Sequence, residues 1–355
     1  MLKSTNDILN ERQNAILAFV EANKSVSIGQ IFEHIHKNFE KITRITVSRD
    51  LEKLLKLTLI EKQGESKRAV VYRVSSQYSI LKKIDVEKYF ANDVDQRKVR
   101  EKFNFDIFEQ LENIFTDTEK NKLFELNEIY RQKIKNVSPD ALKKEIERLN
   151  IDFSWKSSKI EGNTYSLLET EQLIKNRKEA DGHSKEEAVM ILNHKKALEY
   201  IGSNKKEFQS VSVSKIENIH SLLVDGLNVT KNLRKTLVGI TGTNYKPLDN
   251  EFQIKEALEK SCKIVNEKTD AFEKAVILML LIAYVQPFVD GNKRTSRLSG
   301  NAILQSFDSC PLSYRSMDEG EYKKAILLFY EQNNISYFKE LFLKQFEFAV
   351  ENYFG

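Results

Sequence analysis

Apolar residues recur every three or four positions along most of this 355-residue chain, and this spacing predicts a mostly helical protein. Near the N-terminus the same spacing predicts three helices, at residues 10–22, 28–36 and 46–57. Ser27 is placed to cap the second of them. Two runs rich in apolar and β-branched residues follow at 57–62 and 68–74, and they predict strands joined by the polar loop 63–67.

Basic residues concentrate in this N-terminal part. Residues 41–73 carry nine Lys or Arg against four Asp or Glu, although the formal net charge of the whole chain is only +4. Three helices followed by a two-stranded ribbon resemble a winged helix-turn-helix, in which the third helix would enter the major groove of DNA. Lys67 and Arg68 would then lie on the wing. The candidate DNA-contacting residues are Thr43, Arg44, Thr46, Ser48, Arg49 and Lys53. A small fold that contacts only other proteins is the alternative.

Helical spacing continues through the rest of the chain. Residues 84–148 are predicted to be helices with few breaks, and the charged stretch 93–102 is predicted to be a solvated helix face. A long apolar helix is predicted at 272–285, and further amphipathic helices follow it. Residues 232–248 contain β-branched residues and two glycines, which predict a short hairpin among the helices.

Composition narrows the class of protein. Charged residues make up 30% and hydrophobic residues 41%, as in soluble globular proteins, and 355 residues favour two domains. The apolar run 275–285 is too short to span a bilayer, and the N-terminus lacks the apolar core of a signal peptide, so no membrane is expected. Only Cys262 and Cys310 occur, without metal-ligand spacing, and we expect a reducing cytoplasm.

The most specific chemistry lies at residues 286–297, which have the sequence QPFVDGNKRTSR. Pro287 ends the preceding helix, Gly291 permits a tight turn, and a new helix is predicted from Asn292. The unpaired backbone N–H groups at the start of a helix bind anions, and the helix dipole favours negative charge there. This stretch therefore predicts a site for phosphate groups.

Three charged residues extend this prediction. Arg294 and Arg297 are one helical turn apart, so both lie near the predicted anion site. Asp290 could hold a hard cation such as Mg²⁺, which would bridge phosphate oxygens. Together these residues predict a site for a nucleotide and a metal ion.

At this level of detail the stretch resembles the motif HPFx(D/E)GNGRxxR of Fic-domain proteins, whose members typically transfer AMP from ATP to a hydroxyl side chain of a target protein. The matching residues are Pro287, Phe288, Asp290, Gly291, Asn292, Arg294 and Arg297. The resemblance implies that Phe288 anchors the loop and that Asp290 holds Mg²⁺. It also implies that Gly291 and Asn292 form the anion hole, and that the two arginines clamp phosphates.

Two positions depart from that motif. Gln286 replaces the histidine that acts as general base in the family, and an amide has no useful basicity. Loss of a positioned base typically lowers a rate by roughly 10²–10⁴-fold. Lys293 replaces a glycine, as in GNKR forms of the family that include a toxin branch transferring a phosphate instead of AMP. The resemblance therefore leaves AMP transfer and phosphate transfer open.

A second motif, SSKIEG at residues 157–162, resembles the inhibitory motif (S/T)xxxE(G/N) of Fic proteins, carried here by Ser157, Glu161 and Gly162. The resemblance implies that Glu161 pairs with Arg297 and so competes with phosphate for its bidentate face. The end of a helix with Gly162 as its cap is the simpler interpretation, and both can hold.

A third segment, residues 232–248, resembles the Fic flap, which binds a target segment as an added strand. The resemblance implies a docking edge formed by Val238, Gly239, Ile240 and Thr241. A hairpin with no target is the alternative.

The sequence thus predicts a mostly α protein with a winged helix at 1–80, a helical linker at 84–148 and an all-α Fic domain with a hairpin flap at 149–355. Three functions compete: an ATP- and Mg²⁺-dependent transferase of weakened activity toward an unknown target protein, an inactive nucleotide sensor that controls a DNA-binding regulator, and a scaffold. The intact phosphate-binding residues argue against the scaffold. A homo-oligomer is left open.

Overall fold

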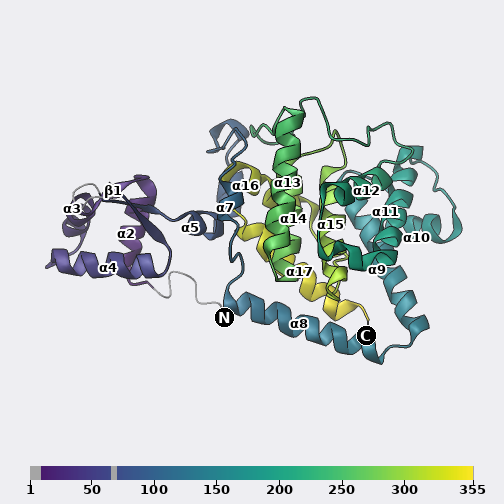
Figure 1. The fold of residues 1–355 in the computed structure, drawn as a ribbon, viewed down its shortest axis with the longest axis horizontal. Helices are drawn as coiled ribbons and strands as arrows, with labels where there is room; N and C mark the ends of the chain where they lie inside the picture. The colour runs from purple at the N-terminus through teal and green to yellow at the C-terminus, as the bar shows by residue number, and fades with distance from the viewer. Residues whose placement is uncertain (1–8, 65–69, 355) are drawn as a thin grey trace. The chain divides into compact units, whose positions relative to one another are not determined.

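The computed structural model describes residues 9–64 and 70–354 and confirms a mostly helical protein (Figure 1). The chain divides into two compact units, Met1–Lys83 and Ile84–Gly355. The helical region before residue 149 belongs to the larger unit.

The smaller unit contains the three predicted helices and a small sheet. Its elements are α2 Glu11–Ala22, β1 Val26–Ser27, α3 Ile28–Asn38, α4 Arg44–Lys56, β2 Ile60–Gln63, β3 Val71–Val74 and α5 Ser76–Leu81. The sheet is antiparallel with strand order β1-β3-β2, and Ile60 lies opposite Val74. The two-residue strand β1 was not predicted, because two residues are too few to show an alternating pattern. The element order is that of the predicted winged helix.

Local capping explains where these helices begin. Ser27 caps α3 as predicted, and its side chain accepts a hydrogen bond from the backbone of Gln30. The third helix begins at Arg44, two residues earlier than predicted, because Thr43 caps it by accepting from the backbone of Thr46. Residues 65–69, which include Lys67 of the predicted loop and Arg68 of the predicted second strand, lie outside the described residues.

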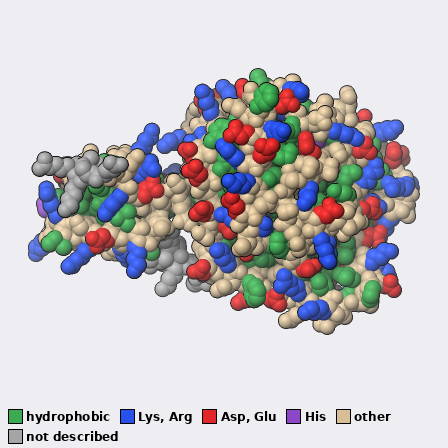
Figure 2. Space-filling view, in the orientation of Figure 1, with side chains coloured by type: hydrophobic (Ala, Val, Ile, Leu, Met, Phe, Trp, Pro, Cys, Tyr) green, Lys and Arg blue, Asp and Glu red, His purple; other side chains and the backbone are tan. Residues whose placement is uncertain are grey.

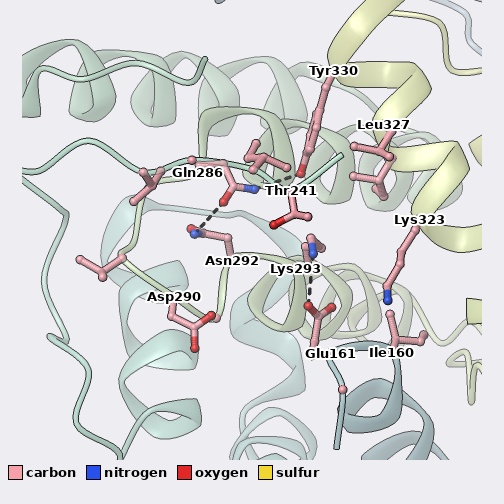
Figure 3. Close-up of a pocket in the computed structure, with 17 residues that line it drawn as sticks. Ile160, Glu161, Thr241, Gln286, Asp290, Asn292, Lys293, Lys323, Leu327 and Tyr330 are labelled. Carbon is pink, nitrogen blue, oxygen red and sulfur yellow. Dashed lines mark hydrogen bonds and ion pairs between the residues drawn. The ribbon is translucent and has the colours of Figure 1, made fainter. Parts of the chain in front are cut away.

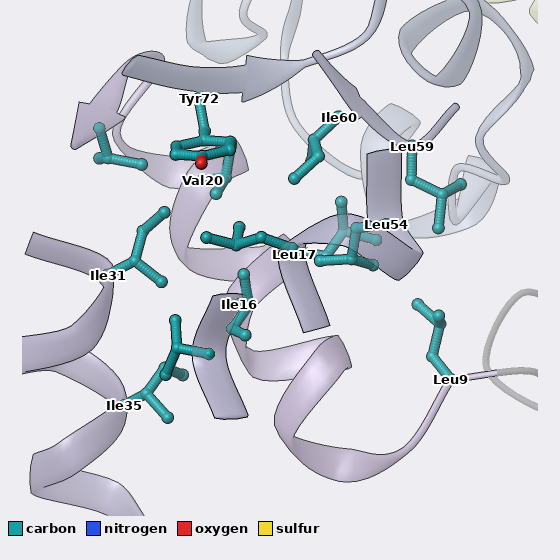
Figure 4. Close-up of a cluster of buried hydrophobic side chains, with 13 residues drawn as sticks. Leu9, Ile16, Leu17, Val20, Ile31, Ile35, Leu54, Leu59, Ile60 and Tyr72 are labelled. Atoms are coloured by element: carbon teal, nitrogen blue, oxygen red, sulfur yellow. The ribbon is translucent and has the colours of Figure 1, made fainter. Parts of the chain in front are cut away.

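The helices α2 to α5 of the described residues and the sheet contribute to one core (Figure 4). Ile16, Ile31, Val47 and Leu54 are among its fully buried side chains, and Tyr72 of β3 covers them from the sheet. These are the apolar positions whose spacing predicted the helices, so burial of that face holds the three helices together.

The larger unit is built from helices. Its α-helices are α6 Val86–Phe90, α7 Ile107–Gln110, α8 Asp117–Asn136, α9 Pro139–Ile160, α10 Leu167–Asn176, α11 Lys185–Ser203, α12 Val213–Leu223, α13 Glu251–Glu267, α14 Ala271–Val285, α15 Asn292–Ser306, α16 Glu319–Gln332 and α17 Ser336–Asn352. Two 3₁₀ turns, η1 Val94–Gln96 and η2 Lys205–Gln209, complete the regular elements described here.

Helices α14 and α15 run side by side in the middle of this unit (Figure 1). Every residue of α14 from Phe272 to Val285 is buried, including the charged Glu273 and Lys274, and burial of the apolar run 275–285 agrees with its sequence. Gly300 lets α15 approach α14 closely, since a Cβ at this position would lie 2.6 Å from the side chain of Met279 of α14. Helix α15 also contacts α9, α11 and α12, so neighbouring helices hold it on several sides. No helix within the described part of the chain is long and apolar enough to cross a membrane.

The prediction of helices with few breaks at 84–148 was wrong for residues 97–106, which form no helix. The stretch 93–102 is likewise not a solvated helix face. Arg97 is buried, pairs with Glu331 at 3.2 Å and donates to the backbone oxygen of Gly242 at 2.6 Å. The backbone N–H of Arg100 bonds to the oxygen of Glu331 at 2.9 Å. These long-range bonds replace the local bonds that a helix would make.

The predicted hairpin at 232–248 was also wrong, because the segment contains no strand that pairs with another part of itself. The buried Arg234 instead ties two backbone oxygens of the segment to the end of α14. The guanidinium donates to the backbone oxygens of Gln286 at 2.6 Å and Thr236 at 2.8 Å, and also to that of Leu248. A side chain that bonds several backbone oxygens thus stabilises an irregular loop where β-branched residues alone predicted strands.

Candidate functional site

The site begins where α14 ends. Gln286 adopts a left-handed conformation with φ of 50° and Gly291 one with φ of 81°, so the chain reverses between α14 and α15 as predicted. Asn292 fixes the loop, because its Oδ1 accepts from the backbone of Phe288 at 2.8 Å and its Nδ2 donates to the Phe288 oxygen at 2.7 Å. The Asn292 side chain therefore shapes the loop, and only its backbone N–H remains to bind an anion.

The stacked rings of Phe288 and His220 pack against this loop. Phe288 is fully buried, and its ring stacks on His220 with 3.6 Å between the ring centroids. Nε2 of His220 lies 3.0 Å from the backbone oxygen of Asp290, which can only accept a hydrogen bond. Burial lowers the pKa of His220, and its stacked, hydrogen-bonded ring has a structural role in this position.

Gln286, at the position of the missing base, is held by hydrogen bonds at both ends of its amide. Its Nε2 donates to the backbone oxygen of Ala283 at 2.6 Å and lies 3.0 Å from the hydroxyl of Tyr330. Its Oε1 accepts from Nδ2 of Asn292 at 3.0 Å. The side chain is buried and connects α14, the loop and α16, so the structure gives it a packing role and no proton to exchange.

The C-terminal end of helix α9 contacts Arg297 of α15. Nη1 of Arg297 lies 2.9 Å from Oε1 of Glu161, so the contact implied by the second motif is present. Nη2 donates to the backbone oxygen of Ser157 at 2.8 Å, and Nε donates to its hydroxyl at 2.9 Å. The guanidinium, which is fully buried, is thus held on three sides by one helix end.

His194, which the sequence did not place near phosphate, completes this arrangement. Burial lowers its pKa to about 3, with a further contribution from the Arg294 charge, so the ring is neutral. Its Nδ1 faces the backbone oxygen of Met190 and therefore carries the proton, and its Nε2 accepts from the Ser157 hydroxyl at 3.0 Å. His194 thus orients Ser157, and Ser157 in turn orients Arg297.

Glu161 has a second cationic partner (Figure 3). Its Oε2 lies 3.3 Å from Nζ of Lys293, the residue that departs from the usual glycine. Burial alone would raise the pKa of Glu161, but the Arg297 and Lys293 charges outweigh it and lower the pKa to about 2. The carboxylate therefore stays ionised and bound to two cations at the beginning of α15.

Asp290 and Arg294 form the other ion pair of the loop, with 2.8 Å between Oδ2 and Nη2. The Asp290 side chain is 63% exposed, whereas that of Arg294 is 2% exposed. Nη1 of Arg294 is a buried donor without a hydrogen-bond partner in the described structure. No cluster of three or more potential metal ligands occurs among the described residues, so a metal ion would rely on Asp290 and on ligand oxygens.

A cavity of about 430 Å³ opens above the loop, and most of the predicted site residues line it. The predicted residues in its wall are Glu161, Gly162, Val238, Gly239, Ile240, Thr241, Gln286, Asp290, Gly291, Asn292 and Lys293. Ser157, Arg294 and Arg297 lie buried behind this wall. The predicted DNA-contacting residues belong to the smaller unit, on α4 and its cap.

Sequence reasoning missed one wall of the cavity. The residues it did not assign are Ile160, Val289, Lys323, Ile326 and Leu327. The last three residues and Tyr330 have the i, i+3, i+4, i+7 spacing of one helix face. This spacing could have predicted that they lie together. Asn333, at the end of the same helix, accepts a hydrogen bond from Asn104 at 2.9 Å and does not line the cavity.

Comparison with known proteins agrees with this geometry. Residues 210–304 match the Fic/DOC family. The protein adenylyltransferase Fic of Nematostella vectensis is 26% identical over 203 residues, which are 54% of this chain and 46% of the relative. The enzyme of the same name from Aedes aegypti is 28% identical over 213 residues, 57% of this chain and 42% of the relative. The chain thus spans less than half of the length of either relative.

Solved structures show the same fold. Residues 134–508 of Fic-1 from C. elegans superpose with a TM-score of 0.57 at 20% identity, covering 66% of this chain and 70% of that one. A Fic domain containing signaling protein from Bacteroides thetaiotaomicron gives a TM-score of 0.56 at 17% identity, covering 65% and 94%. From the family match and the shared fold, we conclude that this chain contains a Fic/DOC family domain, matched at residues 210–304.

Proposed function

We propose that the larger unit binds ATP in the cavity above the loop and that Glu161 inhibits this binding. The observation that carries the proposal is the Glu161 carboxylate itself. It lies between Arg297 and Lys293 at the beginning of a helix, where two cations and backbone N–H groups suit phosphate oxygens. A protein carboxylate already occupies the position that a terminal phosphate would take, so the phosphate must displace it.

The residues present fit a magnesium ion brought by the nucleotide. Asp290 is exposed at the cavity wall, and one carboxylate together with phosphate oxygens and water is a usual set of Mg²⁺ ligands. When bound, the ion would neutralise phosphate charge. The buried, unpartnered Nη1 of Arg294 supplies a further donor beside Asp290.

Transfer of AMP to a protein hydroxyl, as the names of the relatives describe, is the reaction that we propose for the site, at a reduced rate. The amide of Gln286 is engaged at both ends and cannot accept a proton from an incoming hydroxyl. The phosphate-binding groups remain, so binding and positioning alone would support slow transfer.

A second candidate is a nucleotide sensor for a DNA-binding regulator. It is favoured by the packing role of Gln286 and by α4 of the smaller unit, where Arg44 and Arg49 are exposed. Figure 2 shows Lys and Arg side chains along the part of the surface that α4 forms. In this case ATP would bind to the larger unit without turnover.

Calorimetric titration with Mg-ATP tests the shared first step. We expect Glu161→Gln to bind ATP about tenfold or more tightly than the unsubstituted protein, because the neutral amide no longer holds Arg297 and Lys293. Glu259→Gln is the matched control, since Glu259 is an exposed carboxylate on α13. Absence of binding by both the unsubstituted protein and Glu161→Gln would refute the proposal, and equal affinities would refute the inhibitory role.

A further inference from the structure

One face of α16 forms a wall of the cavity and changes character along its length. Tyr330, Leu327 and Ile326 give its C-terminal part an aromatic and aliphatic surface, and Lys323 gives its other end a positive charge. Seven residues of helix separate the two ends, a rise of roughly 10 Å. A nucleoside triphosphate has complementary ends, because its flat base suits an aromatic and aliphatic surface and its negatively charged phosphates suit a lysine.

Lys323 faces the part of the cavity where the inhibitory contact lies. Figure 3 shows its side chain extending from α16 beside Ile160, toward the side on which Glu161 meets Lys293. None of the ion pairs or hydrogen bonds found within residues 9–64 and 70–354 engages its ammonium group. By contrast, the adjacent Lys324 lies 2.7 Å from Glu87 and 2.9 Å from Glu321.

The charges around this end of the cavity are unbalanced. Four cations, Lys293, Arg294, Arg297 and Lys323, accompany two carboxylates, Asp290 and Glu161. Asp290 is paired with Arg294, so departure of Glu161 would leave the other three cations without a counter-charge. A terminal phosphate, with more negative charge than a carboxylate, would restore the balance.

We propose that Lys323 is a nucleotide-binding residue that contacts the terminal phosphate from the α16 side, across the cavity from Lys293, and so selects triphosphate over diphosphate. This inference rests on the proposed function, because it requires that the cavity bind a nucleotide after Glu161 has moved. Arg297 and Lys293 hold the terminal phosphate from α15, and Lys323 closes the opposite side.

The test compares Glu161→Gln with Glu161→Gln/Lys323→Gln by calorimetric titration with Mg-ATP, Mg-ADP and adenosine. A lost charge-assisted hydrogen bond predicts about a tenfold or greater loss of ATP affinity. ADP affinity should fall by roughly twofold at most and adenosine affinity should not change, because only the triphosphate reaches the lysine. Glu161→Gln/Lys324→Gln, which removes the neighbouring charge, should bind all three ligands like Glu161→Gln.

The outcomes separate the two proposals. If Glu161→Gln does not bind Mg-ATP at all, the proposed function fails and this inference fails with it. If Glu161→Gln binds Mg-ATP but the Lys323→Gln double variant binds it equally well, or loses ATP and ADP affinity to the same extent, the inference fails alone. A matching loss in the Lys324→Gln double variant would show a general effect of net charge and would also overturn it.

Discussion

Glu161 is held more firmly than the second motif by itself would require. A carboxylate paired with one arginine must give up one ion pair to phosphate, whereas Glu161 must leave both Arg297 and Lys293. Its pKa of about 2 means that this ion pair stabilises the fold fully above the ordinary carboxyl pKa of 4.5 and loses its contribution as the pH falls toward 2. Protonation near neutral pH therefore cannot release Glu161, and displacement by a charged ligand remains the available route.

The role of Gln286 can be measured by restoring the base. In a Glu161→Gly background, we expect Gln286→His to raise incorporation of label from α-labelled ATP into protein by roughly 10²-fold or more, the usual contribution of a positioned base. Gln286→Asn is the control, because it changes the same buried position without adding a base. Comparable labelling by Glu161→Gly and its Gln286→His derivative would contradict the view that the missing base limits transfer.

At the residue scale, the sequence predicted the positions whose chemistry is tied to a contiguous motif. The turn at Gly291, the helix start at Asn292 and the contact of Glu161 with Arg297 are present in the structure. Lys323 and His194 were not assigned, because each reaches the site from a different helix and neither belongs to a local pattern. Which side chains share a cavity depends on the packing of whole helices, which local spacing does not describe.

At the scale of elements, helices with a continuous apolar stripe were predicted well, and segments held by long-range polar contacts were not. Helix α14 follows directly from its apolar run. Residues 97–106 and 232–248 have compositions that suit helix or strand, but each contains a buried arginine that makes long-range contacts. Arg97 pairs with Glu331 and binds the backbone oxygen of Gly242, and Arg234 binds backbone oxygens of its own segment and of Gln286. The contacts of Arg97 and Arg234 determine the conformations of these two segments, and a single sequence does not reveal which arginines are buried.

The Arg97–Glu331 pair gives a prediction at this scale. Both side chains are buried, with 4% and 0% exposed, and Arg97 also donates to the oxygen of Gly242 beside the cavity loop. Arg97→Ala leaves a buried charge and should lower the free energy of unfolding of the larger unit by about 3–5 kcal/mol. Urea unfolding followed by the fluorescence of Trp155, the only tryptophan of the chain, measures this unit alone.

Lys122→Ala is the control for this measurement, because Lys122 pairs with Glu347 at the surface and its loss should cost about 1 kcal/mol or less. A change of similar size in both variants would argue against a special role of the buried pair.

At the scale of the whole molecule, the two units carry different chemistry. The larger unit contains the cavity for which we propose nucleotide binding, and the smaller unit contains the basic helix α4. On α4, Arg44 and Arg49 are exposed, whereas Lys53 donates to the side chain of Gln13 at 3.0 Å. Among the residues predicted to contact DNA, the two arginines are therefore best placed to bind phosphate groups.

Arg49→Ala tests this interpretation in the full-length chain. Binding to a fluorescent duplex of mixed sequence is measured by anisotropy at several salt concentrations. If Arg49 contacts a phosphate, its loss should weaken binding and reduce the slope of log affinity against log salt by about one. Lys263→Ala removes one exposed charge from α13 of the larger unit and should leave the slope unchanged. Equal slopes for Arg49→Ala and the unsubstituted protein would exclude Arg49 from a DNA interface, and equal losses in both variants would show that net charge alone drives binding.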